Sequence, residues 1–278
     1  MGRGSIINWI LVGLGVVVIV ALLLWQNIPM MYEQDASRSH YIVLKQVWPA
    51  CFCHIIGYPC DFVEKTLFIG GFWPMTSSAS PRNDCQLAPT FSLALIGVSS
   101  SSDPSHPIVF QNIRPKLENL WPDLFQINIS SRFLWEQEWV RRGSCAYEDR
   151  IINSQNDYFF KALKLHGDAD TLHKLAKANI KPSNKQQISS QTLIDTLRKA
   201  YDKRVVATCA GMDDICLKEI IICYDNSLRM IDCPDSFTGL EFSFVDRDYV
   251  NSNHLNGISY ESIDCPKNIK FPEFPTLE

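Results

Sequence analysis

The sequence lacks the basic excess that a dedicated nucleic-acid-binding protein usually shows. Its formal net charge is −4 at pH 7, whereas binding to nucleic-acid phosphates is driven by the counterions that lysine and arginine release. The sequence also lacks the composition of a disordered chain, because hydrophobic residues make up 46% and charged residues 20%. Its 278 residues suffice for one large domain or two small ones. We therefore expect a globular protein, in which a local basic patch is still compatible with these numbers.

Acidic residues are absent from the beginning of the chain, which instead carries one long apolar segment. Ile6 to Trp25 is apolar apart from Asn8 and two glycines, and no acidic residue precedes Glu33. Twenty helical residues rise about 30 Å, which is the thickness of a bilayer core. A cleavable signal peptide usually has a shorter apolar core and a small-residue cleavage site, for which residues 35–37 offer only a weak candidate. The segment predicts a signal anchor over residues 1–26, with a cleaved signal peptide as the alternative.

The charge before this segment indicates where the body of the protein lies. Arg3 precedes the segment, and basic residues favour the cytosolic side of a membrane. This predicts a linker over residues 27–40 and a lumenal or extracellular body over residues 41–278, in a single-pass membrane protein of the secretory pathway. Asn128-Ile129-Ser130 is an N-glycosylation acceptor that fits such a location. If the segment is cleaved, the body is secreted.

The ten cysteines all follow the apolar segment, and they lack the repeated close pairs of a zinc site. Cys51 and Cys53 stand close together, but no second pair matches them, so we expect no metal ion. Behind an export signal, cysteines are typical of disulfides. The spacing by itself does not fix which cysteines pair.

Strand-like and helix-like segments follow one another in blocks along the body. Runs of β-formers predict strands at 41–48, 66–69, 205–209, 217–224, 228–233 and 240–245, and Gly70-Gly71 is expected to end the second of these. A proline-free segment predicts a helix at 130–142, and apolar stripes predict helices at 154–165, 170–178 and 190–201. Helices grouped between strands indicate an α+β protein.

Two segments carry the most informative motifs. They read Phe68-Ile69-Gly70-Gly71-Phe72-Trp73-Pro74 and Gln137-Glu138-Trp139-Val140-Arg141-Arg142-Gly143-Ser144-Cys145. With Trp48-Pro49-Ala50-Cys51-Phe52-Cys53 upstream, they closely resemble the ribonuclease T2 family, whose motifs read roughly I-H-G-L-W-P and H-E-W-x-K-H-G-T-C. The resemblance covers about Tyr41 to Phe274. It implies the α+β ribonuclease T2 fold, an antiparallel sheet flanked by helices.

The cysteines fit the same family pattern. The resemblance implies the disulfides Cys53–Cys60, Cys85–Cys145, Cys209–Cys265 and Cys223–Cys233. Cys51 and Cys216 are left over. They either bond each other or leave one thiol free, and Cys51 could also displace Cys53 as the partner of Cys60.

The family cleaves RNA by attack of the ribose 2′-hydroxyl on the adjacent phosphorus, using one histidine from each motif as acid and base. Here the first-motif histidine position is Gly70, and the second-motif position is Arg142, which stays protonated at any relevant pH. The auxiliary histidine position is Gln137. The family glutamate survives as Glu138, and Arg141 keeps the charge of the family lysine.

These departures predict a pseudo-ribonuclease, membrane-anchored or secreted, that acts by binding and needs no cofactor. One alternative is an endoribonuclease with a rewired or weak site, although none of the six histidines occupies a motif position. Another is weak binding of RNA or nucleotide without cleavage, for which Trp73, Glu138, Arg141 and Arg142 are the candidate contacts. The sequence does not identify a protein partner.

Overall fold

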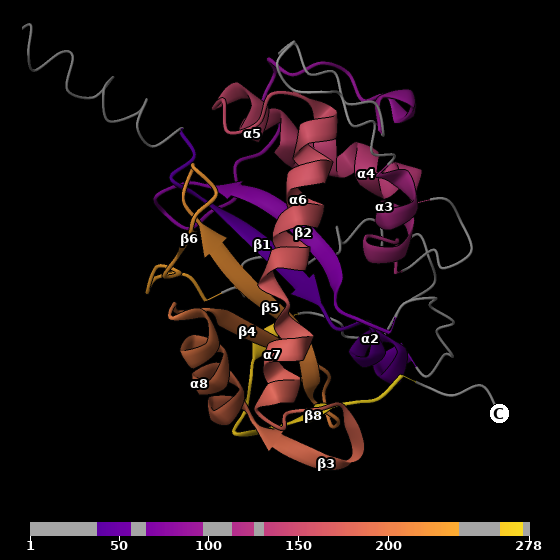
Figure 1. Cartoon of the computed structure of the whole chain (residues 1–278), viewed down its shortest axis with the longest axis vertical. Helices are drawn as coiled ribbons and strands as arrows, with labels where there is room; N and C mark the ends of the chain where they lie inside the picture. Colours follow the sequence, from indigo (N-terminus) through magenta and orange to yellow (C-terminus); the bar gives the residue numbers. More distant parts are fainter. Residues whose placement is uncertain (1–37, 57–64, 97–112, 125–130, 239–261, 275–278) are drawn as a thin grey trace, which may run out of the picture. The chain divides into compact units, whose positions relative to one another are not determined.

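The computed structural model of the chain describes residues 38–56, 65–96, 113–124, 131–238 and 262–274 (Figure 1). The predicted signal anchor, the glycosylation acceptor Asn128 and the predicted strand at 240–245 lie outside these residues. Within the described ranges, no helix is long and apolar enough to span a bilayer. Residues 39–278 form one compact unit.

A single twisted sheet organises this unit. Its main path has the strand order β2-β1-β5-β4-β7. These strands are β1 (Tyr41–Val47), β2 (Phe68–Met75), β4 (Val206–Ala210), β5 (Cys216–Tyr224) and β7 (Ile263–Asp264). The short β6 (Met230–Ile231) pairs with β5, and β3 (Ser183–Ser189) pairs with β8 (Asn268–Phe271). The pairings are antiparallel except for β5 with β8, which is parallel.

The central strands are buried on both faces, which is why they read as continuous β-forming runs and not as alternating patterns. Every residue of β1, β2 and β5 is buried. Ile42 and Leu44 belong to the larger apolar cluster, whereas Val43 packs with Trp73 and Ile221 in a smaller one. Since side chains alternate along a strand, the two clusters lie on opposite faces of the sheet.

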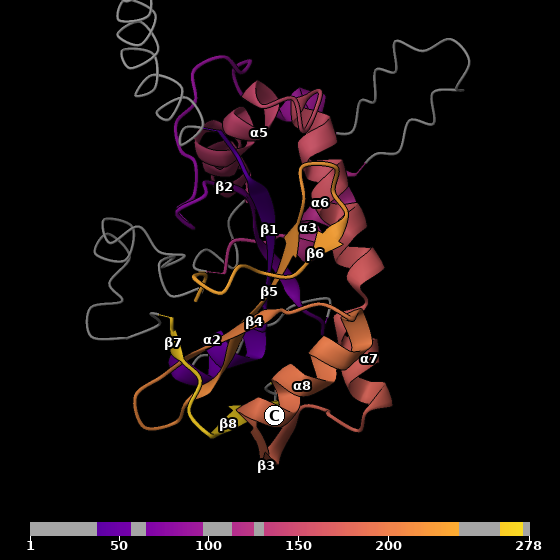
Figure 2. The same cartoon turned by 90° about the vertical axis from the view of Figure 1, so that its left-hand side faces the viewer.

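Helices cover the sheet and build the remainder of the body. They are α2 (Pro49–Ile56), α3 (Arg114–Leu120), α4 (Arg132–Glu138), α5 (Ser144–Glu148), α6 (Gln155–Ala169), α7 (Thr171–Lys177) and α8 (Ser190–Tyr201). A 3₁₀ turn spans Leu93–Leu95, and a π-helical turn, Trp139–Gly143, separates α4 from α5. Figure 2 shows α6 and α7 running along one side of the sheet. The first turn of α6 is capped by Ser154, whose hydroxyl accepts from the Asp157 amide at 3.1 Å.

Two sequence-based boundaries were wrong for identifiable reasons. The strand expected to end at Gly70-Gly71 continues to Met75 as β2, because Gly70 occupies a bulge: Lys45 pairs with Gly71 and Gln46 with Ile69. The helix expected at 130–142 is interrupted by the π-helical turn. Helices α2, α3 and α5 and strands β3, β7 and β8 were not predicted, since their short segments carry little periodicity.

Disulfides staple the unit. The expected pairs Cys85–Cys145, Cys209–Cys265 and Cys223–Cys233 are present. The two leftover cysteines form a further bond, Cys51–Cys216, which joins α2 to β5. Cys53 is also in a disulfide, and its expected partner Cys60 lies outside the described residues.

Candidate functional site

The two motif segments meet at one buried hydrogen-bonded contact. Trp73 in β2 donates its indole Nε1–H to Glu138 at the end of α4, with distances of 3.0 Å to Oε2 and 3.2 Å to Oε1. Tyr158 of α6 donates to the Phe72 carbonyl at 2.6 Å and lies 3.4 Å from Glu138 Oε2. Glu138 is only 8% exposed and Trp73 only 4%. The surviving family carboxylate is therefore bonded within the protein and presents little surface to solvent.

Arg142 packs against the same indole. Its guanidinium carbon lies 4.5 Å from the centroid of the Trp73 ring, a typical cation–π distance. One of its nitrogens, Nη1, donates to the Arg82 carbonyl at 3.2 Å. The π-helical turn that carries Arg142 also needs its glycine, because a Cβ on Gly143 would stand 2.5 Å from the Trp139 ring. The backbone around Arg142 is thus fixed by packing.

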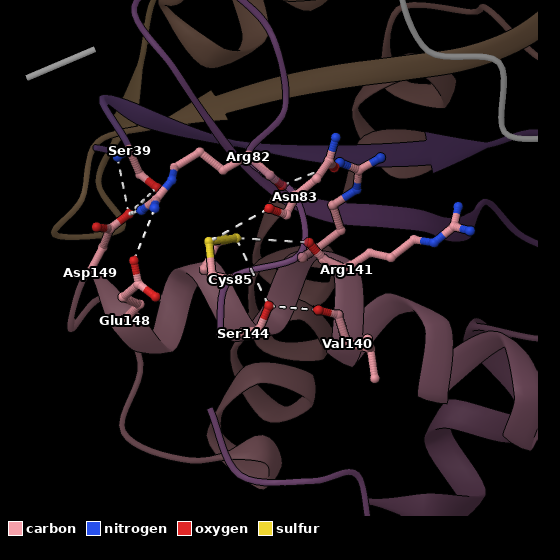
Figure 3. Close-up of a disulfide and its surroundings, with 11 residues drawn as sticks. Ser39, Arg82, Asn83, Cys85, Val140, Arg141, Ser144, Glu148 and Asp149 are labelled. Atoms are coloured by element: carbon pink, nitrogen blue, oxygen red, sulfur yellow. Dashed lines mark hydrogen bonds and ion pairs between the residues drawn. A yellow bond between two sulfur atoms is a disulfide. The ribbon is translucent and has the colours of Figure 1, made fainter. Parts of the chain in front are cut away.

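The loop that follows β2 is fixed by an ion-pair network and a disulfide (Figure 3). Arg82 pairs with Glu148 at 3.1 Å and with Asp149. Asp149 in turn accepts from the backbone amide of Ser39 at 3.0 Å. The Cys85–Cys145 bond ties this loop to α5. Because the Arg82 carbonyl also accepts from Arg142, the network holds one wall of the site in place.

The remaining motif residues do not converge on Glu138. Gly70 sits at the β-bulge and has no side chain. Gln137 is half-buried, whereas Arg141 is exposed, and Figure 3 shows the Arg141 side chain pointing away from the Cys85 disulfide. Of the four candidate RNA contacts, Trp73, Glu138 and Arg142 lie together and Arg141 stands apart on the surface.

Burial dominates the electrostatics of the site. It raises the pKa of Glu138 to about 7, and the positive charge of Arg142, the Trp73 hydrogen bond, the charge of Lys45 and the Tyr158 hydroxyl each offset part of that rise. Burial also lowers the pKa of Arg142, against the charge of Glu138. Glu138 can therefore exchange a proton near neutral pH, while Arg142 remains a cation.

The sequence analysis missed Lys45 as a member of this site. Lys45 lies in the middle of β1, fully buried, with its Nζ 4.5 Å from the centroid of the Trp73 ring. Its Nζ also lies 3.1 Å from the carboxylate of Glu219 in β5, which is fully buried as well. The available signal was the presence of charged residues in two apolar β-forming runs, Lys45 in the first and Lys218 and Glu219 in the second.

The histidines in the described part of the chain have partners other than Glu138. His54 Nε2 is 3.4 Å from Asp214, His166 Nδ1 is 3.0 Å from Gln46 Nε2, and His173 Nδ1 is 2.9 Å from Asp170. His40 is exposed, and its backbone amide donates to Met75. His106 and His254 lie outside the described residues. Within the described part of the chain, no group of three or more His, Cys, Asp or Glu side chains could hold a metal ion.

Comparison of the sequence with known proteins identifies the family. A model of the ribonuclease T2 family matches residues 39–233. Ribonuclease T2 of Danio rerio is 30% identical over 199 residues, which are 70% of this chain and 73% of that protein. Ribonuclease T2 of Sus scrofa is 28% identical over 204 residues, 72% of this chain and 90% of that protein. The chain belongs to the ribonuclease T2 family.

Solved structures share the fold at lower sequence identity. RNase NT in complex with 5′-AMP aligns with a TM-score of 0.61 and 18% identity, over 85% of this chain and 99% of that one. Ribonuclease MC1 from the seeds of bitter gourd aligns with a TM-score of 0.58 and 20% identity, over 70% of this chain and 94% of that one. The α+β ribonuclease T2 fold is therefore the fold of this chain.

Proposed function

We propose that this protein is a ribonuclease T2 family member without catalytic activity, which acts by binding. The observation that carries the proposal is the composition of the site around Glu138. Where the family motifs have histidines, this chain has Gly70, which offers no side chain, and Arg142, which is packed on Trp73. Transphosphorylation needs one group to take the 2′ proton and another to protonate the leaving oxygen.

Glu138 alone does not supply both roles. Its pKa of about 7 suits one proton transfer near neutral pH, but no second titrating group is described beside it that reaches solvent. General acid and base groups each contribute roughly 10²–10⁴-fold to a rate. A chain lacking both histidines should therefore retain at most a trace of ribonuclease activity.

The packing of the site supports the same proposal. The Glu138 carboxylate is bonded to Trp73, and Arg142 is stacked on that indole and bonded to the backbone of Arg82. A phosphate entering the site would have to displace contacts that are already made. This argues against the alternative of a rewired endoribonuclease, because Glu138, the carboxylate that survives from the family motif, is already engaged.

RNA capture without cleavage is the second candidate. RNase NT was solved with 5′-AMP and an RNase MC1 variant with 5′-GMP, so this fold accommodates nucleotides in those proteins. In the present chain, Arg141 is an exposed cation that neighbours Arg142 in the second motif. Binding through exposed cations depends on phosphate contacts and should weaken with added salt.

We also propose that the body is displayed in the secretory pathway by the apolar segment Ile6 to Trp25, with the family domain over residues 41–278. The disulfides support an oxidising compartment. Cleavage of the segment would release the same body as a secreted protein. Glycosylation at Asn128 remains part of this proposal.

The decisive experiment is an RNA cleavage assay on the purified full chain between acid and neutral pH. We expect no cleavage above that of a Glu138→Ala variant. Robust cleavage that disappears in Glu138→Ala would refute the proposal in favour of the rewired enzyme. In parallel, equilibrium binding of single-stranded RNA separates the second candidate: salt-sensitive binding that weakens in Arg141→Ala and Arg142→Ala favours capture, and absent or salt-independent binding rejects it.

A further inference from the structure

The interior of the sheet holds an ion pair that neither family motif contains. Lys45 and Glu219 are both without solvent exposure, and Lys45 Nζ lies 3.1 Å from Glu219 Oε1. Glu219 Oε2 also accepts from the Thr208 hydroxyl at 3.3 Å. Taking two charges out of water costs several kcal/mol per ion unless geometry and hydrogen bonds compensate. A pair in this position therefore needs a reason beyond filling space.

The position of Lys45 connects the pair to the site. Lys45 is the register partner of Gly71 in β2 and of Ile221 in β5. Because Gly71 has no side chain, the Trp73 indole lies against it: a Cβ there would stand 2.4 Å from the indole Nε1. The same indole is 4.5 Å from Lys45 Nζ. Lys45 thus reaches the ring that donates to Glu138.

The charges around Trp73 balance without any ligand. Lys45 and Arg142 each lie 4.5 Å from the centroid of the Trp73 ring. At pH values above the Glu138 pKa of about 7, the carboxylates of Glu138 and Glu219 offset the charges of these two cations. A cleft that awaits a phosphate is expected to keep excess positive charge.

We infer that Lys45 is a positioning residue: from inside the sheet, it holds the hydrogen bond between Trp73 and Glu138 in its present geometry with no bound anion. Burial lowers the pKa of Lys45, and the charge and hydrogen bond of Glu219 offset part of that lowering. The 3.1 Å contact with Glu219 also keeps the Lys45 ammonium beside the indole. This inference rests on the proposed function, in which side chains of the protein itself occupy the site. The Lys45–Glu219 pair then stabilises a site that has lost its catalytic histidines.

The first test is stability of the full chain. Lys45→Met leaves Glu219 buried without its cation and should lower Tm by roughly 10 °C. Lys45→Met with Glu219→Gln removes both charges and should recover most of that loss. The matched control is Lys270→Met, which removes a lysine that pairs with Asp214 at 2.7 Å on the surface. A Lys45→Met protein as stable as the wild type overturns the inference.

The second test reads the site itself. The Trp73 indole N–H signal, assigned by its loss in Trp73→Phe, reports the ionisation of Glu138 in an NMR pH titration. The groups facing Glu138 are Arg142, Tyr158, Trp73 and Lys45. In Lys45→Met with Glu219→Gln, loss of the nearby cation should move the midpoint upward by about one pH unit.

Lys45→Arg, which keeps the charge, should move the midpoint much less, and Lys270→Met not at all. A midpoint unchanged in the folded double variant overturns the positioning role, because a purely structural ion pair would leave the titration where it was. Cleavage of RNA by the wild type, measured alongside, would refute the proposed function and leave this titration result standing on its own.

Discussion

Acid should destabilise this protein through one buried histidine, His166 in α6. His166 is 8% exposed, and burial lowers its pKa from the usual 6.5 to about 4, against a hydrogen bond with the Leu67 backbone. Its Nδ1 lies 3.0 Å from Gln46 Nε2. The Gln46 carbonyl accepts from Thr171, so the Gln46 amide nitrogen is the donor and Nδ1 the acceptor. A proton on His166 Nδ1 would turn this acceptor into a donor that faces the N–H of Gln46, and the hydrogen bond would be lost.

The sign and size of the effect follow from the two pKa values. A histidine whose folded pKa is depressed contributes its full stability above the unfolded pKa of 6.5, and loses it as pH falls towards about 4. The difference corresponds to about 3 kcal/mol, at about 1.4 kcal/mol per pH unit. We expect the wild type to lose this amount relative to a His166→Gln variant between neutral pH and pH 4.

Glu138 changes the unfolding free energy with pH in the opposite direction to His166, so its effect masks the stability that protonation of His166 removes. Its folded pKa is raised from 4.5 to about 7, so the stability contributed by its neutral form is full below 4.5 and is lost as pH rises through 7. The wild-type profile alone can therefore look flat. Single variants separate the two groups: His166→Gln should make stability rise towards acid, and Glu138→Gln should make it fall.

The assay is urea unfolding of the full chain at several pH values between 7 and 4, with disulfides intact. The quantity compared is the change in unfolding free energy with pH, variant against wild type, so groups common to both cancel. A His166→Gln profile parallel to the wild-type profile would show that His166 is not buried as a neutral ring, and the reasoning from burial to acid sensitivity would be wrong.

Two further predictions concern the disulfides and the missing catalytic acid and base. Replacing Cys51 and Cys216 by alanine removes a crosslink of 165 residues, of which the Cys85–Cys145 bond already shortens 60; the effective loop of about 100 residues predicts a loss of up to about 5 kcal/mol. Removing Cys223–Cys233, with a separation of 10, should cost about 3 kcal/mol in the same urea experiment, and equal losses would contradict the loop-length argument. Gly70→His with Arg142→His should restore some RNA cleavage relative to Gly70→Ala with Arg142→Gln. A folded histidine variant that binds RNA and stays inert would show that the site differs at further positions, with Lys45 the first to replace.

The motifs and their order in the sequence determined the family and the fold class. Trp73 with Pro74, and Glu138 with Trp139, mark a strand and a helix that the family brings together, and the structure joins them through the Trp73–Glu138 hydrogen bond. The loss of the histidines could also be read directly, because a glycine or an arginine at a motif position excludes proton transfer there whatever the surroundings. Local chemistry of this kind needs no coordinates.

Only the tertiary structure decided how the site is occupied. Lys45 and Glu219 lie far apart in sequence, and each alone looks like an ordinary charged residue in a strand; the pairing of β1 with β5 brings them together. Arg142, which stacks on Trp73, lies in a π-helical turn that the sequence pattern did not predict. Burial and long-range register are properties of the assembled sheet, so the sequence could name the site's missing groups but not the side chains that now fill it.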